Sequence, residues 1–361
     1  MMAIDKVNDG KSKKGKLSKS QKRGAAKVLA ITALTQLAMR TLIRATKQAS
    51  EQLSDDIAQI LDTYKQKGGF SSREEARQYM DGFVKPKDID LLIERARKLP
   101  EPYRTQELTR LSTPAYSYRM TRKKAIDEAQ KIESRVLAGK YDKVLKSTGK
   151  EVMDESVSRL AYDSSMEAGI GISFDIPNME AVDETLRGEG VYDKVKLFTD
   201  EEMKEVKRIC TKGWLDGHSY DDIAKDVEAL TGKESYKCVR LVRTTMAQAS
   251  IDADYEEMKD LGFKEYEIHC TLDEKTCEIC GRYDGKIVKV GSGGPMPTFH
   301  PNCRCYITTV MNAEGRMRAA RNAEGKTIKV PASMTYNEYI MRYGSDAAKK
   351  RLGIETGKFD E

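Results

Sequence analysis

The sequence predicts a mainly α protein, in which a helical N-terminal region is followed by an α+β C-terminal domain with a small knuckle-like β element. Only 39% of its 361 residues are hydrophobic and 33% are charged, which suits long solvated helices that each bury a narrow stripe. Apolar residues spaced three and four apart recur through most of the chain before Gly262, as helices require. Alternating apolar residues and a group of cysteines follow Gly262, and these predict the β element.

Positive charge is concentrated at the N-terminus. The formal net charge is +6, but the first fifty residues hold twelve Lys or Arg against two Asp or Glu. Residues 1–24 are therefore predicted to form a basic flexible arm on a nearly neutral body. Such an arm can neutralise phosphates without reading base sequence, and a solubilising tail is the alternative. The candidate nucleic-acid contacts are Lys11, Lys13, Lys14, Lys16, Lys19, Lys22, Arg23 and Lys27.

Residues 25–170 are predicted to form a helical domain. A first helix is expected over residues 25–65, and the glycines of "KGGF" interrupt it. The stretch "SSREE" restarts a helix, because a serine N-cap is followed by acids in the first turn. A short helix follows Pro86, and a long helical tract runs from Pro114 to about Ala168.

The composition changes at "GIGISFDIPN", residues 169–178, where two glycines and a proline interrupt the helical pattern. We therefore expect a connector over residues 171–198, a second domain over residues 199–312 and a C-terminal extension over residues 313–361. Acid pairs such as Asp55/Asp56 are interpreted as charges on exposed helix faces. No stretch is apolar over a length that could span a bilayer, so no membrane association is predicted.

Three helices and two strands are predicted in the second domain. The first helix is expected to begin at Thr199, an N-cap with Glu202 three residues on. The second begins at Ser219 and closes at Gly232, and the third spans 234–261 before Gly262 ends it. The stretches "KEYEIHCTL" and "GKIVKV" alternate apolar and polar residues, which predicts two short strands.

Most of the cysteines gather in one place. Cys277 and Cys280 form a C-x-x-C pair, His300 and Cys303 form an H-x-x-C pair, and nineteen residues separate the two pairs. Two short pairs that face each other can complete a tetrahedron, so three thiolates and one imidazole predict a structural zinc site. Cys305 is the alternate ligand. The β element is therefore interpreted as zinc-knuckle-like.

Two other interpretations of this cluster stay open. A disulfide pair is one, although the long chain and the isolated Cys210 and Cys238 favour a reduced compartment. A catalytic zinc site is the other, with Glu278 or Asp284 as the base. The zinc deaminase pattern is missing, because a proline and an asparagine follow the histidine. Phosphate-binding loops, dinucleotide fingerprints and nucleophile elbows are missing too, so no enzymatic activity is predicted.

The stretch "DEKTCEICGRYDGK … HPNCRC" resembles the signature of the tailed-phage head morphogenesis family, the minor head proteins related to protein F of phage Mu. The upstream order of "GHSYDDIAKDV", "VRTTMAQASIDADYEEMKDLG" and a strand is similar too, and the resemblance covers 199–310. The chain departs from the family at Arg243, Thr244 and Thr245, where members commonly have Arg-Thr-Glu. No role of that missing acid can be carried over to this sequence.

The resemblance implies a minor capsid component of a phage or prophage, associated with the portal vertex and with other capsid components. It also implies a location in the virion, with the host cytoplasm as the site of assembly, and a role in DNA packaging or delivery. The basic arm suits contact with packaged DNA. The alternative functions are a zinc-dependent nucleic-acid enzyme and a zinc-ribbon DNA-binding protein.

Overall fold

The computed structural model describes residues 19–61, 70, 72–168, 177–188, 190–310 and 317–351. Of the predicted nucleic-acid contacts, Lys11, Lys13, Lys14 and Lys16 lie outside the described residues. Lys19, Lys22, Arg23 and Lys27 lie on the first helix, but their side chains are not part of the described structure.

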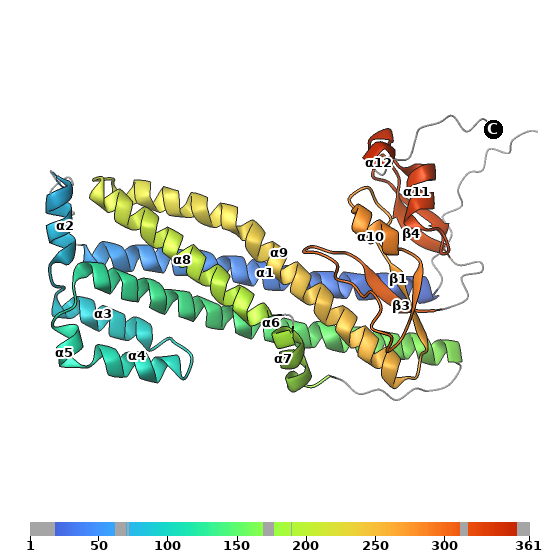
Figure 1. Ribbon diagram of the computed structural model, residues 1–361, viewed down its shortest axis with the longest axis horizontal. Coiled ribbons are helices and arrows are strands. Elements are labelled where there is room, and N and C mark those ends of the chain that lie inside the picture. The colour runs from blue at the N-terminus through green and yellow to red at the C-terminus, as the bar shows by residue number, and fades with distance from the viewer. Residues whose placement is uncertain are drawn as a thin grey trace, which may run out of the picture.

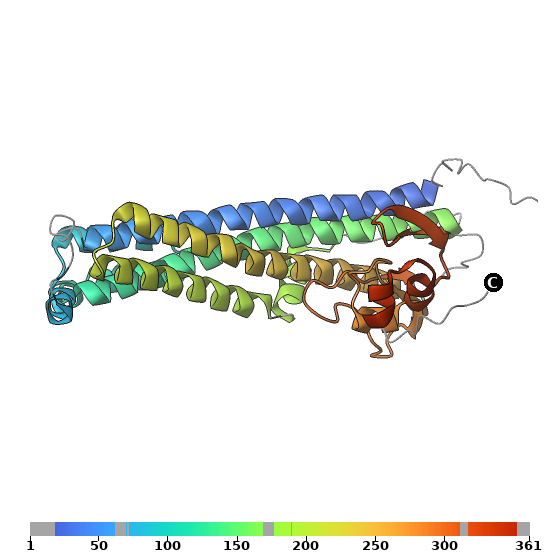
Figure 2. The same ribbon diagram turned by 90° about the horizontal axis from the view of Figure 1, so that it is seen from above.

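Four long helices form a bundle within the described part of the chain. They are α1 (Lys19–Ile60), α6 (Arg122–Ala168), α8 (Val191–Leu215) and α9 (Tyr220–Asp260). Figure 1 shows that α1 and α8 run in one direction and that α6 and α9 run in the other. Every pair of these helices is in contact, and the view in Figure 2 shows the same elongated bundle from above.

One continuous core runs along the bundle. It takes buried apolar side chains from every long helix, for example Leu53 of α1, Leu145 of α6, Val206 of α8 and Val242 of α9. Since each helix contributes one stripe, the low hydrophobic content is sufficient to fill this core. The mainly α prediction is confirmed.

Shorter helices flank the bundle. Figure 1 shows α2 to α5 gathered at one end of it, and α7 packs against α6, α8 and α9. The Ser72 N-cap is confirmed, because its hydroxyl accepts a hydrogen bond from the Glu75 N–H at 3.1 Å. The short helices are α2 (Arg73–Asp81), α3 (Pro86–Ala96), α4 (Tyr103–Leu111), α5 (Pro114–Ser117) and α7 (Met179–Gly188).

Two predicted helix ends are wrong. Thr199 is not an N-cap but a fully buried residue inside α8, because Val191 and Val195 upstream of it also pack into the core. Gly232 does not close a helix, since α9 continues to Asp260. A glycine within a helix costs only about 1 kcal/mol, and the buried side chains that follow it outweigh this cost.

Other helix signals are correct. The Ser219 hydroxyl caps α9 by accepting from the Asp222 N–H at 3.2 Å. Gly262 follows the end of α9 with φ of 76°, a conformation that favours glycine. Part of "GIGISFDIPN" lies outside the described residues. The described part of the expected connector, 171–198, is mainly helical, because it contains α7 and the start of α8.

Residues 265–310 and 317–351 form a compact assembly, here termed the C-terminal unit, beside one end of the bundle (Figure 1). Its described strands form an antiparallel sheet in the order β2-β1-β3 and a separate β4-β5 hairpin. Its elements are β1 (Glu265–His269), α10 (Glu278–Tyr283), β2 (Lys286–Lys289), β3 (Tyr306–Thr309), β4 (Met317–Arg321), β5 (Thr327–Pro331), α11 (Tyr336–Tyr343) and α12 (Asp346–Arg351).

The sheet packs on the end of α9. Tyr266 and Ile268 of β1 are buried together with Ile251 and Met258 of α9, and the strand alternates between buried and half-buried residues as expected. The predictions of β1 and β2 are confirmed, whereas β3, β4 and β5 were not predicted.

The predicted C-terminal extension shares a core with the cysteines. Val330, Tyr336 and Tyr339 are fully buried in the same cluster as Cys280 and Cys303. The expected boundary at residue 312 therefore runs through one hydrophobic cluster. Among the described residues, no helix combines the length and the apolar character that crossing a membrane would need.

Candidate metal centre

The C-x-x-C pair lies at the start of a helix. Cys277 is the N-cap of α10, and its Sγ accepts a hydrogen bond from the Cys280 N–H at 3.4 Å. The step of three residues between these positions makes about one helical turn, so both sulfur atoms lie on the same side of α10. Because Cys277 caps the helix and Cys280 lies three residues later, the C-x-x-C spacing brings the two candidate ligands close together.

The H-x-x-C pair is held by a tight turn against the bundle. The Cys303 N–H donates to the His300 carbonyl at 3.1 Å, and Asn302 between them has φ of 62°. Asparagine tolerates this left-handed conformation better than most residues. The Asn302 N–H donates to Thr244 Oγ1 of α9 at 3.0 Å, so this hydrogen bond fixes the turn to α9.

The structure brings the predicted ligands together. His300 Nε2 lies 3.1 Å from Cys277 Sγ and 3.0 Å from Cys280 Sγ. Cys280 Sγ lies 3.6 Å from Cys303 Sγ. A tetrahedral zinc ion with Zn–S bonds of about 2.3 Å separates its sulfur ligands by roughly 3.7 Å. The Cys280–Cys303 spacing is that of two zinc ligands, whereas Cys303 does not lie within 4.8 Å of both Cys277 and His300.

Cys280 links two overlapping groups. One contains Cys277, Cys280 and His300, and the other contains Cys280, Cys303 and Cys305, with the ligand atoms of each group within 4.8 Å of one another. These five residues are here termed the Cys/His cluster. A small cavity of about 30 Å³ is lined by all of them except Cys303.

The histidine is oriented for ligation. His300 Nδ1 lies 2.8 Å from the Pro301 carbonyl, so a proton on Nδ1 would donate there and leave Nε2 free to face the sulfurs. Metal-bound histidines commonly have such a second partner. Partial burial acts to raise the pKa of Cys277, but hydrogen bonds from Cys280 and the proximity of His300 outweigh it and lower this pKa. A lower pKa favours the thiolate that binds metal.

Two ion pairs surround the cluster, one half-exposed and one buried. Asp273 accepts two hydrogen bonds from Arg304, the longer at 2.7 Å. Asp284, whose side chain is fully buried, accepts from Arg318 of β4 at 3.1 Å and from the Cys270 N–H at 2.8 Å. The first pair joins the segment before Cys277 to the segment that contains Cys303, and the second joins the end of α10 to β4.

The two carboxylates considered as catalytic bases have structural partners. Asp284 is held by Arg318, and Glu278 forms an ion pair with Arg282 on the exposed side of α10. His269 stacks on Tyr306 and lies 3.0 Å from Thr308 Oγ1. Burial lowers the pKa of His269 to about 4, so this imidazole is neutral near pH 7.

Sequence reasoning missed the residues that support the cluster from the C-terminal side. Tyr336 donates to the Thr276 carbonyl at 2.9 Å, directly before the first ligand. A capping box could have identified its helix, because Thr335 and Glu338 have the required spacing. Arg318 and Arg304 carried no such signal, since their partners are distant in the sequence.

Residues 204–308 match the family model described as Phage Mu protein F like protein. The match begins within α8, includes all of α9 and ends within β3, so it contains the whole Cys/His cluster. This match confirms the resemblance found in the cysteine spacing and the helix order. No curated protein and no solved structure matches the chain.

Proposed function

We propose that this chain is a minor head protein of a tailed phage or prophage, acting in head assembly at the portal vertex. The observation behind the proposal is the family match over 204–308, which covers the second half of α8, all of α9 and the Cys/His cluster together. Its partners would be the portal protein and capsid components. It would lie in the virion, and in the host cytoplasm during assembly.

The proposal includes a structural zinc ion held by Cys277, Cys280, His300 and Cys303, with Cys305 as the alternate ligand. Zinc would supply folding free energy to loops that contain little regular structure. This matters because the C-terminal unit consists of short strands and helices, and such small elements are marginally stable alone. The ion would act as a cross-link between the helix α10 and the turn fixed to α9.

The bundle supports a role for the basic arm in contacting packaged DNA. The first residues of α1 lie at the same end of the bundle as the C-terminal unit (Figures 1 and 2). The predicted arm runs into the start of α1 at Lys19, so its basic residues would contact DNA at that end. The opposite end, with α2 to α5, would then be available for protein contacts in the head.

Quantitative mass spectrometry of purified heads tests the assignment. Empty proheads and DNA-filled heads from the source lysate would be compared for the number of copies of this chain. A few copies per particle in both would support a minor component at the portal vertex. Absence from both would overturn the proposal, and hundreds of copies would indicate a major capsid protein instead.

A further inference from the structure

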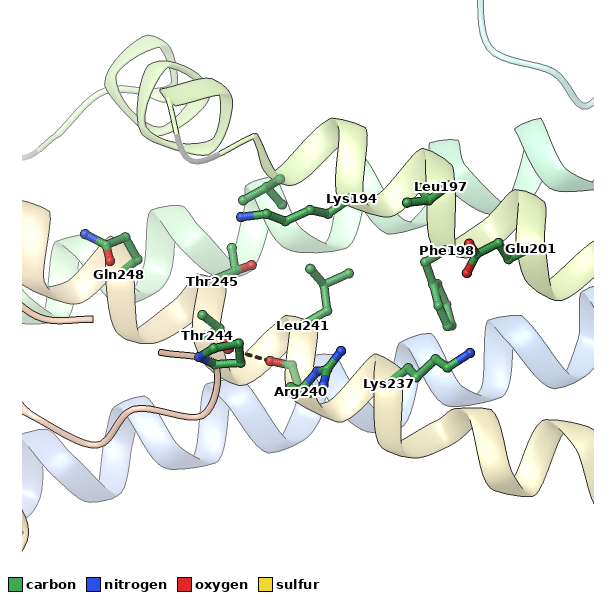
Figure 3. Close-up of a pocket in the computed structure, with 12 residues that line it drawn as sticks. Lys194, Leu197, Phe198, Glu201, Lys237, Arg240, Leu241, Thr244, Thr245 and Gln248 are labelled. Atoms are coloured by element: carbon green, nitrogen blue, oxygen red, sulfur yellow. Dashed lines mark hydrogen bonds between the residues drawn. The ribbon is translucent and has the colours of Figure 1, made fainter. Parts of the chain in front are cut away.

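A groove lies between α8 and α9, next to the Cys/His cluster. It has a volume of about 330 Å³, near the lower end of the roughly 300–1,000 Å³ that ligand pockets span. Figure 3 shows Leu197 and Phe198 on α8 facing Leu241 on α9. Leu197 is 61% exposed, so it adds apolar surface at the edge of the groove.

The groove is positively charged at its edges. Lys194 of α8 and Lys237 and Arg240 of α9 line it, and Glu201 is the acidic residue among its lining side chains (Figure 3). These four charged residues carry a net charge of +2. A segment that fits here should combine large apolar side chains with a net negative charge.

The metal-binding turn forms one wall of this groove. Pro301 lines it and directly follows the proposed ligand His300. Thr244 and Gln248, which also line it, accept hydrogen bonds from the same turn: Asn302 N–H donates to Thr244 Oγ1 at 3.0 Å, and Thr298 N–H donates to Gln248 Oε1 at 3.1 Å. The turn therefore forms one wall of the groove and holds two of its lining side chains by hydrogen bonds.

One segment of the chain has the matching chemistry. Residues 352–361, "LGIETGKFDE", lie outside the described residues, and their sequence contains Leu352, Ile354 and Phe359. Three acidic residues and one lysine give the segment a net charge of −2. Its charge and its apolar content thus complement those of the groove.

The segment also starts close enough to reach the groove. Arg351, the last residue of α12, donates to the Thr276 carbonyl at 3.3 Å, and Thr276 precedes Cys277. Cys277 Sγ lies 3.1 Å from His300, whose neighbour Pro301 lines the groove. Phe359 is the eighth residue after Arg351, so an extended segment would carry it up to about 26 Å from the end of α12.

We propose that the groove between α8 and α9 binds the acidic, apolar segment 352–361, with Phe359 against the apolar wall and the acids against Lys237 and Arg240. The contact would cover the exposed leucine and join the last helix to the bundle across the metal-binding turn. It is independent of the head assignment, because it concerns the purified chain alone.

Photocrosslinking in the full chain tests this proposal. The photoreactive p-benzoylphenylalanine would replace Phe359, and crosslinked peptides would be identified by mass spectrometry. We expect crosslinks to α8 and α9 around Leu197 and Leu241. A mixture of isotope-labelled and unlabelled chains would separate contacts within one molecule from contacts between copies. Crosslinks within one molecule support the proposal, and crosslinks formed only between copies would overturn it.

Charge variants make the test specific. Lys237→Glu combined with Arg240→Glu should lower the yield of these crosslinks by roughly tenfold, because attraction becomes repulsion. Adding Asp360→Lys and Glu361→Lys to that variant should restore the yield, which a misfolded chain could not do. Lys225→Glu, on α9 but outside the groove and 75% exposed at its side chain, should leave the yield unchanged. Crosslinks that map elsewhere, or a yield unaffected by the paired reversal, would overturn the proposal.

Discussion

Gly281 shows how closely the C-terminal unit is packed around the Cys/His cluster. It follows the ligand Cys280 in α10, and a Cβ at this position would lie 2.3 Å from a ring carbon of Tyr336. The Tyr336 side chain is fully buried, so it has little room to move. The absence of a side chain at this position therefore allows α11 to pack against α10.

We expect Gly281→Ala to destabilise the C-terminal unit by about 1–3 kcal/mol, the usual cost of overpacking. Gly188→Ala is the matched control, because a Cβ at that helical position meets nothing within 4 Å, and it should be neutral or slightly stabilising. Hydrogen exchange over residues 265–351 of the full chain would measure the difference. Equal protection in the two variants would mean that α11 does not pack as described.

At the scale of single residues, the Cys/His spacing predicted which side chains gather in space better than the capping patterns predicted the helix ends. The ligand spacing is local, so Cys277, Cys280 and His300 could be grouped before any fold was known. Thr199 has the local pattern of an N-cap, but burial against the bundle core overrides it. No local signal distinguishes a capping threonine from one buried within a longer helix.

At the scale of elements, a buried charge cluster joins α1, α3 and α6. Arg95 of α3 donates to both oxygens of Asp56 of α1, at 2.9 to 3.1 Å. Asp56 is only 2% exposed, so its interpretation as a solvated surface charge is wrong. The cause is the packing of α3 across α1, a long-range contact that the acid pair itself does not indicate.

Glu133 of α6 lies in the same cluster and is 4% exposed. Burial, together with the negative charge of Asp56, raises the pKa of Glu133 to about 7, although Lys140, Lys98 and Arg95 oppose the shift. The folded state therefore holds this proton more tightly than the unfolded state does. The free energy of unfolding should fall as the pH rises from about 4.5 to 7.

We expect Glu133→Gln to remove this loss of stability, because the amide stays neutral. Between pH 5 and pH 8, the free energy of unfolding of the parent chain should fall by a few kcal/mol relative to that of the variant. Urea unfolding followed by circular dichroism at the two pH values measures this difference. Glu151→Gln, at an exposed position on the same helix, is the control. A difference between Glu133→Gln and the parent that does not change with pH would contradict the assignment.

Elements with a strong local period were predictable, and elements held by distant contacts were not. The long tract up to Ala168 and the strand around Tyr266 have clear spacing, and both are present. The hairpin of β4 and β5 is mostly exposed, with one well-buried residue in each strand. Its alternation is therefore weak, and its position depends on the Arg318 contacts with Asp284 and with the Cys270 carbonyl.

At the scale of the whole molecule, the bundle and the C-terminal unit differ in how their cores are built. The bundle has one continuous apolar core. The C-terminal unit divides its buried residues between two smaller clusters, one against α9 and one around the cysteines. The sequence predicted both regions, but not that residues 317–351 complete the second cluster, because their partners lie far away along the chain.

We propose that a zinc ion in the Cys/His cluster joins these parts of the C-terminal unit. Measurement of the zinc content of the full chain by native mass spectrometry tests it most directly. Cys280→Ser is the decisive variant because Cys280 belongs to both ligand groups. Cys210→Ser is the control, since Cys210 is buried in the bundle core. We expect about one zinc ion per chain in the parent and in Cys210→Ser, and none in Cys280→Ser. A parent chain without zinc, or full zinc content in Cys280→Ser, would contradict the account.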